Sequence, residues 1–86
     1  MSAEIWRAKY NLVLSALTQE QLSFIDNIIY RSDDGTYELS ADDFKDLKDK
    51  KGELEKTYKT EFTKLFQAFE KEIKKGHGHF SFRVFG

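Results

Sequence analysis

Apolar residues recur at helical spacing over three long stretches of this sequence. In the first stretch, residues 3 to 17, large apolar side chains return every three or four positions, and charged residues fall between them. This spacing predicts an amphipathic helix with one broad apolar face. The apolar positions of this stretch are Ile5, Trp6, Tyr10, Leu12, Val13, Leu14 and Leu17.

A second helix is predicted from Gln19 to Tyr30, and its start is well marked. Thr18 suits the N-cap position, and Gln21 three residues later completes a capping box. Leu17 and Leu22 would flank this cap as a hydrophobic staple. Apolar residues cover more than half of the helix circumference, so we expect this helix to be the most buried one.

The third and longest helix is predicted to begin after Ser40 and to run to Lys75. Ser40 can cap it, and Asp43 lies at the third helical position. Gly52 leaves open whether the helix is kinked or broken; a single helix is favoured because an interior Gly costs only about 1 kcal/mol. Its apolar stripe consists of Phe44, Leu47, Leu54, Tyr58, Phe62, Leu65, Phe66, Phe69 and Ile73.

The C-terminal segment, residues 76–86, alternates in a way that is typical of a strand. Phe80, Phe82 and Val84 fall on one face, whereas His79, Ser81, Arg83 and Phe85 fall on the other. Its partner within the chain would be residues 36–39, which predicts a small two-stranded ribbon of 36–39 with 79–85.

The predicted fold is therefore mainly α, a three-helix bundle-like domain with a long third helix. The 86 residues are enough for one domain only, which we place over residues 1–86. A composition of 40% hydrophobic and 15% aromatic residues supplies a core and excludes a disordered chain. The predicted core is Trp6, Val13, Ile25, Ile29, Phe62, Phe66 and Phe69.

Charge and cysteine content narrow the class of protein further. The net charge of −1 provides no general basic field for nucleic acid, and only the tail after Ile73 carries cations without acids. The lack of cysteine excludes disulfides, thiolate zinc sites and cysteine nucleophiles. The N-terminal residues lack a secretory pattern, and no apolar stretch reaches the ~20 residues of a membrane span. A cytoplasmic protein without membrane contact is the expectation.

Oxygen-bearing side chains recur through residues 32–43, "SDDGTYELSADD", at spacings found in calcium sites. Leu39, Ser40 and Asp43 occupy what would be the eighth, ninth and twelfth places of a calcium loop. This half of the segment resembles the end of an EF-hand loop. The resemblance extends over about residues 17 to 47 and implies a calcium-binding helix-loop-helix.

The front of this segment departs from the EF-hand pattern. Ser32 stands where Asp is needed, Tyr37 stands where the turn needs Gly, and Asp43 is one methylene shorter than the closing Glu. The alternative interpretation is a turn in which Asp33, Asp34 and Gly35 stop one helix and Ser40 starts the next. We favour this turn, because capping and turn formation account for the same residues.

No metal, cofactor or catalytic centre is expected elsewhere. His77 and His79 would be two zinc ligands on one face of a strand, but a structural zinc site needs four. The sequence has no phosphate-binding glycine loop and no set of nucleophile, base and orienting residue. We therefore predict a protein that is not an enzyme.

The sequence favours a small interaction protein, an adaptor or inhibitor that binds a protein partner. We expect the large apolar residues to exceed what a small core can bury. We expect the contact to involve the end of the long helix and the tail, and a homodimer through the same surface is left open. The predicted contact residues are Phe66, Phe69, Ile73, Phe80, Phe82, Arg83 and Phe85.

The alternative function is that of a nucleic-acid-binding regulator. Lys74, Lys75 and Arg83 would contact phosphates while the tail aromatics stack on bases. With three cations and an acidic body, the electrostatic contribution would be modest.

Overall fold

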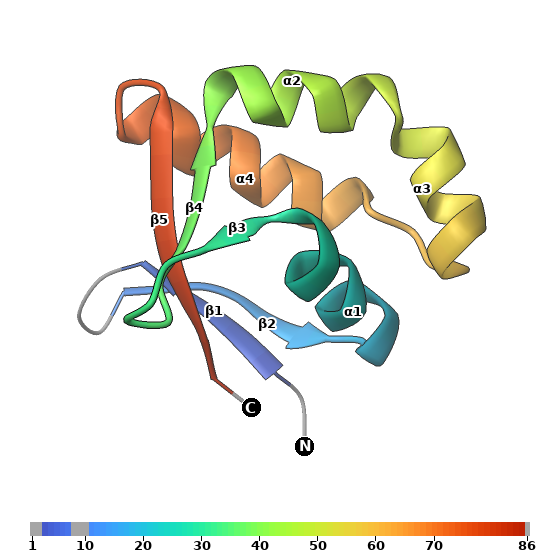
Figure 1. Cartoon of the computed structure of the whole chain (residues 1–86), viewed down its shortest axis with the longest axis horizontal. Coiled ribbons are helices and arrows are strands. Elements are labelled where there is room, and N and C mark those ends of the chain that lie inside the picture. The colour runs from blue at the N-terminus through green and yellow to red at the C-terminus, as the bar shows by residue number, and fades with distance from the viewer. Residues whose placement is uncertain (1–2, 8–10, 86) are drawn as a thin grey trace.

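A computed structural model of the chain describes residues 3–7 and 11–85 and shows an α+β fold (Figure 1). The elements are β1 (Ala3–Arg7), β2 (Asn11–Leu17), α1 (Gln19–Ile28), β3 (Tyr30–Arg31), β4 (Tyr37–Ser40), α2 (Ala41–Asp49), α3 (Lys51–Tyr58), α4 (Thr63–Lys75) and β5 (His79–Phe85). The strands form one antiparallel sheet in the order β2-β1-β5-β4-β3. The helices lie to one side of this sheet, and the other side faces solvent (Figure 1).

The prediction of a mainly α, three-helix bundle is wrong, and the largest error lies at the N-terminus. Residues 3–7 and 11–17 of this segment form the antiparallel hairpin strands β1 and β2 instead of a helix. The register shifts twice along the hairpin, so Leu17 lies opposite Ala3 while Leu14 lies opposite Ile5. Because of these bulges, Leu14 and Leu17 share the inner face although they are three residues apart, which is also the spacing of a helix. Tyr10, also assigned to the helix, lies outside the described residues.

The second predicted helix is confirmed as α1, with its cap. The Thr18 hydroxyl accepts a hydrogen bond from the Gln21 backbone N–H at 3.1 Å, and the Gln21 side chain accepts one from the Thr18 N–H at 2.9 Å. The helix ends at Ile28, short of the predicted Tyr30, because Tyr30 and Arg31 pair with β4 as strand β3.

The predicted single long helix is wrong, because the chain turns twice and forms α2, α3 and α4. Ser40 does cap α2, accepting from the Asp43 N–H at 3.2 Å. The first break comes at Lys50, so Gly52 lies inside α3. The second follows Lys59, which adopts a left-handed conformation (φ 56°). The Glu55 carboxylate then accepts from the Phe62 N–H at 2.8 Å, which holds the turn into α4 and lowers the pKa of that carboxyl.

The predicted pairing of residues 36–39 with 79–85 is confirmed, but as part of a larger sheet. Tyr37 lies opposite Phe82 and Ser40 opposite His79. On its other side β5 pairs with β1, so β5 is the central strand. Its predicted alternation is also correct, with Phe80 and Phe82 buried and the intervening side chains on the solvent face.

The core is a layer of aromatic rings between the sheet and the helices. Seven of the eight Phe residues are buried. Phe69 of α4 lies between the layers, its ring centre 6.1 Å from that of Phe80 and 5.6 Å from that of Phe82. The predicted core residues confirmed as buried are Ile25, Ile29, Phe62, Phe66 and Phe69, and Val13 is half-buried against them. The placement of Trp6 in the core is wrong, since Trp6 alternates with Ile5 and lies on the solvent face.

Two polar contacts, Glu72 with Arg7 and Tyr37 with Asp26, tie the helices to the sheet. Glu72 of α4 is buried and pairs with Arg7 of β1 at 3.3 Å and with Lys75 at 3.6 Å. The Tyr37 hydroxyl of β4 donates to the Asp26 carboxylate of α1. Burial and this hydrogen bond raise the pKa of Tyr37 to about 12. The Glu72–Arg7 and Tyr37–Asp26 contacts each join a helix to a strand that is not adjacent to it in the sequence.

The aromatic layer gives a direct stability test. We expect Phe69→Ala to lower the free energy of unfolding by about 3–5 kcal/mol, because truncation of a buried Phe leaves a cavity. Phe85→Ala, the same change at an exposed position, should alter it by no more than about 0.5 kcal/mol. Urea denaturation followed by circular dichroism measures both. Equal losses in the two variants would contradict the inner and outer faces assigned to α4 and β5.

Two glycines should respond to alanine in opposite directions. Gly52 lies inside α3, and a methyl group added there would have open space around it, so Gly52→Ala should raise the unfolding free energy by about 0.5–1 kcal/mol. At Gly76 a Cβ would lie 2.0 Å from the His79 carbonyl oxygen, so Gly76→Ala should destabilise by more than about 1 kcal/mol. Thermal melts of both variants test this; a stabilising Gly76→Ala would contradict the tight α4–β5 turn.

Candidate protein-binding surface

The structure divides the predicted partner-binding residues between the core and the surface. Arg83 and Phe85 are exposed on the solvent face of β5. The others have little surface for a partner to touch, because they form the core between α4 and the sheet. The buried members of the predicted set are Phe66, Phe69, Ile73, Phe80 and Phe82.

Arg83 and Phe85 belong to a contiguous surface that the sequence did not indicate. On the solvent face Leu12 of β2 lies opposite Trp6 of β1, and Trp6 lies opposite Arg83 of β5. Phe85 follows two residues later, opposite Glu4. Leu12 is 49% exposed and Phe85 is 55% exposed. We call Trp6, Leu12, Arg83 and Phe85 the open-face patch.

Neighbouring acids orient the polar groups of this patch. The Trp6 indole N–H donates to the Glu4 carboxylate at 3.2 Å, which satisfies its only donor and fixes the ring against β1. The Arg83 guanidinium lies 3.9 Å from the Asp34 carboxylate, and both side chains are largely exposed. This long contact in solvent leaves most of the Arg83 donors available to another group.

The patch extends to a sheet edge that carries no charge. Strand β2, "NLVLSAL", is an edge strand of seven residues with no Lys, Arg, Asp, Glu or Pro. Proteins commonly protect exposed edges with charges, prolines or bulges, and β2 has only the bulges. The opposite edge, β3, is only two residues long. A protein surface could therefore lie across Leu12 and the β2 edge without burying a charge of β2.

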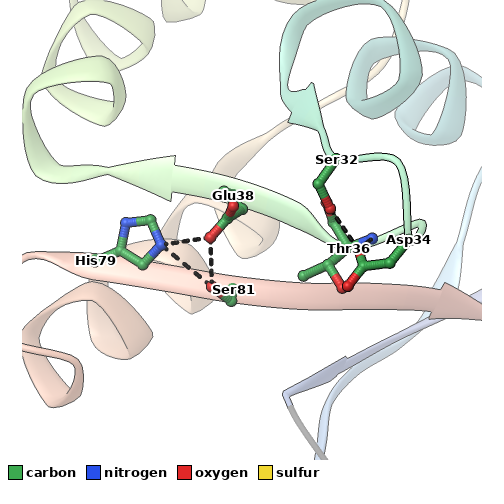
Figure 2. Close-up of polar contacts among 6 residues, drawn as sticks. All are labelled: Ser32, Asp34, Thr36, Glu38, His79 and Ser81. Carbon is green, nitrogen blue, oxygen red and sulfur yellow. Dashed lines mark hydrogen bonds and ion pairs between the residues drawn. The ribbon is translucent and has the colours of Figure 1, made fainter.

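A second cluster on the solvent face joins Glu38, His79 and Ser81 (Figure 2). The Ser81 hydroxyl donates to the Glu38 carboxylate at 3.1 Å, and the His79 Nε2 lies 3.1 Å from both. A catalytic triad needs the imidazole between serine and acid, with one ring nitrogen on each. Here the same nitrogen contacts both groups and the hydroxyl proton goes to the carboxylate. The arrangement ties β4 to β5 and does not prepare Ser81 as a nucleophile.

Residues 32–43, which resemble the end of an EF-hand loop, form a tight turn after β3, then strand β4 and the start of α2 (Figure 2). The turn does not stop a helix as predicted, because strand β3 separates it from the end of α1. The Asp34 carboxylate accepts from the Thr36 N–H at 2.9 Å and from the Ser32 hydroxyl. Gly35 supplies the positive φ of 88° that the turn requires. Asp34 thus closes the turn, while Ser40 and Asp43 belong to the start of α2. Within residues 3–7 and 11–85, no three His, Asp or Glu side chains are grouped to hold a metal.

The cations proposed for nucleic acid are not brought together. Lys74 and Lys75 end α4 on the helical side, and Lys75 pairs with Glu72. Arg83 lies on the opposite face, near the other end of β5. His77 lies in the α4–β5 turn with a φ of 56°, so it does not share a strand face with His79.

Comparison with known proteins adds no assignment. No protein-family model matches the chain, and no curated protein or solved structure matches it significantly. None of the helices in the described part of the chain is long and apolar enough to cross a bilayer.

The turn beside Arg83 makes a pH-dependent contribution to stability. Hydrogen bonds from Ser32 first, and from Thr36, lower the pKa of Asp34 from 3.8 to about 2. Because the folded pKa is lower than the unfolded one, Asp34 stabilises the fold above about pH 4 and loses this effect as pH falls towards about 2.

We therefore expect Ser32→Ala to raise the pKa of Asp34 and to reduce the loss of stability in acid. Arg83→Gln should have a smaller effect, because the guanidinium is the weakest of the contributions. The carboxyl-carbon chemical shift of Asp34, followed by NMR during acid titration, measures the pKa in each variant. A larger shift for Arg83→Gln than for Ser32→Ala would contradict this order.

Proposed function

We propose that the protein is a small non-enzymatic interaction protein, an adaptor or inhibitor, that binds one protein partner through the open-face patch. The observation that carries the proposal is the grouping of Leu12, Trp6 and Phe85 around Arg83 on the face of the sheet that the helices leave open. An antiparallel sheet with one solvated face normally alternates apolar-in with polar-out. Here large apolar side chains occupy outward positions on three adjacent strands.

The composition of the patch matches what protein interfaces use. Trp and Arg are enriched among residues that dominate binding energy, particularly where apolar neighbours exclude water around them. Trp6 is already held by Glu4, so little side-chain freedom is lost on binding. Arg83 supplies a planar donor set suited to a carboxylate. The expected partner presents an apolar surface with an acidic group placed for Arg83.

The surplus of apolar residues, on which the sequence-based argument for this function rests, is smaller than predicted. Most of the large apolar side chains are buried, and among the described residues the large hydrophobic ones left exposed are Leu12, Ile28, Tyr30 and Phe85. What supports the proposal is thus the position of Leu12 and Phe85, adjacent to Trp6, rather than the number of exposed residues.

The test is site-specific photo-crosslinking in the cells that make the protein. Benzoylphenylalanine at position 85 or 12 should yield one discrete adduct, whereas the same group at Lys64, exposed on α4, should not. The adduct is then identified and the binary complex is rebuilt from purified proteins. Phe85→Ser and Leu12→Ser should each weaken the dissociation constant about tenfold, and Phe85→Tyr should retain it.

Three outcomes would overturn this proposal. The first is an equal adduct at position 64, and the second is full affinity in Phe85→Ser. The third is an adduct between two copies of this chain, which would indicate the homodimer. The nucleic-acid alternative would replace it if an oligonucleotide bound with steep salt dependence and lost affinity in the Lys74/Lys75/Arg83→Ala variant.

A further inference from the structure

A groove at the opposite edge of the sheet is a second candidate for recognition. It is an open groove of about 270 Å³ between the end of α1, strand β4 and helix α2. Its floor is apolar and consists of the buried Ile29, Leu39 and Leu47. At one rim lie Ile28, 45% exposed, and Tyr30, 66% exposed. The groove lies away from the open-face patch, which is built on β2, β1 and β5.

The charge around this groove has one sign. Its remaining lining residues are Glu38, Asp43 and Asp46, and no Lys, Arg or His lines it. Glu38 already contacts His79, but none of the ion pairs formed among residues 3–7 and 11–85 involves Asp43 or Asp46. The lining therefore repels anions and favours a cation beside an apolar group.

The neighbouring backbone favours an extended chain as the occupant. Strand β3 pairs only with Tyr37 and Glu38, so within the described part of the chain no strand lies beside Leu39 and Ser40 on that side. Leu39 lines the groove together with Asp43 and Asp46, so an extended segment that lies over Leu39 can place a cation within reach of both carboxylates.

We propose that this groove, Ile28–Tyr30 with Glu38, Leu39, Asp43, Asp46 and Leu47, binds an extended protein segment that carries Lys or Arg next to a large aliphatic side chain. The aliphatic side chain fills the floor over Leu39 and Leu47, and the cation meets Asp43 and Asp46. This inference goes beyond the proposed function, because it uses different residues at a different edge of the sheet.

The acetylated and amidated tripeptide Arg-Leu-Arg is the probe, followed by ¹⁵N–¹H correlation NMR of the full chain. Titration should shift the backbone amides of Leu39, Asp43 and Asp46 and leave those of Trp6 and Arg83 unmoved. The tripeptides Gln-Leu-Gln and Glu-Leu-Glu should bind more weakly in that order, since the neutral one loses the charge attraction and the acidic one is repelled.

A charge-matched pair of variants completes the test. Asp43→Asn with Asp46→Asn should weaken Arg-Leu-Arg binding about five- to tenfold, the loss expected from two exposed ion pairs. Asp42→Asn with Asp49→Asn removes the same charge from α2 outside the groove lining and should leave binding unchanged.

Equal binding of Gln-Leu-Gln, equal effects of the two double variants, or shifts centred on Trp6 and Arg83 would each overturn the inference. None of these outcomes depends on the crosslinks at positions 12 and 85, so the two proposals fail separately.

Discussion

The contact between Phe69 of α4 and the paired rings of Phe80 and Phe82 holds the two layers of this fold together. Phe80 and Phe82 are themselves stacked, with ring centres 4.8 Å apart, on the central strand. Aromatic pairs at these distances add about 0.5–1.5 kcal/mol beyond the area that they bury. The layer continues through Phe66, whose ring centre lies 5.5 Å from that of Phe62. Because the helices pack toward this layer, they leave the second face of the sheet uncovered.

The parts of the fold that the sequence predicts correctly depend on neighbouring residues. Thr18 and Ser40 cap helices through bonds to backbone groups three residues away, so their patterns identify the starts of α1 and α2. The alternation of β5 is equally local. The β1–β2 hairpin is not predicted, because its bulges bring Leu14 and Leu17 to one face of the sheet at the spacing of a helix. The breaks at Lys50 and Lys59 fall at residues that are neither Gly nor Pro, and the second is held by the Glu55 carboxylate, which accepts from the Phe62 N–H.

Less of the candidate sites can be predicted from the sequence, because they depend on contacts between residues that are far apart in the chain. Alternation correctly turns Arg83 and Phe85 outward. Trp6 and Leu12 could not be joined to them, since that requires the β1–β5 and β1–β2 registers, and the spacing within residues 3 to 17 predicts a helix. The acidic groove depends on side chains from α1, β3, β4 and α2 that meet only in the folded chain. The Phe and Ile residues assigned to partner contact are the ones that the core needs most.

The pairing of β1 with β5 brings the first and last strands together at the centre of the sheet, where Ile5 lies opposite Val84 (Figure 1). The middle of the sheet therefore cannot close until β5 has been synthesised. Closing a loop of this length costs conformational entropy before any contact between the strands is gained. Folding should accordingly be slow for a domain of this size. Until β5 pairs with β1, the uncharged β2 strand and the Phe residues of the helices would be exposed together. This partly folded state is the one most prone to aggregation.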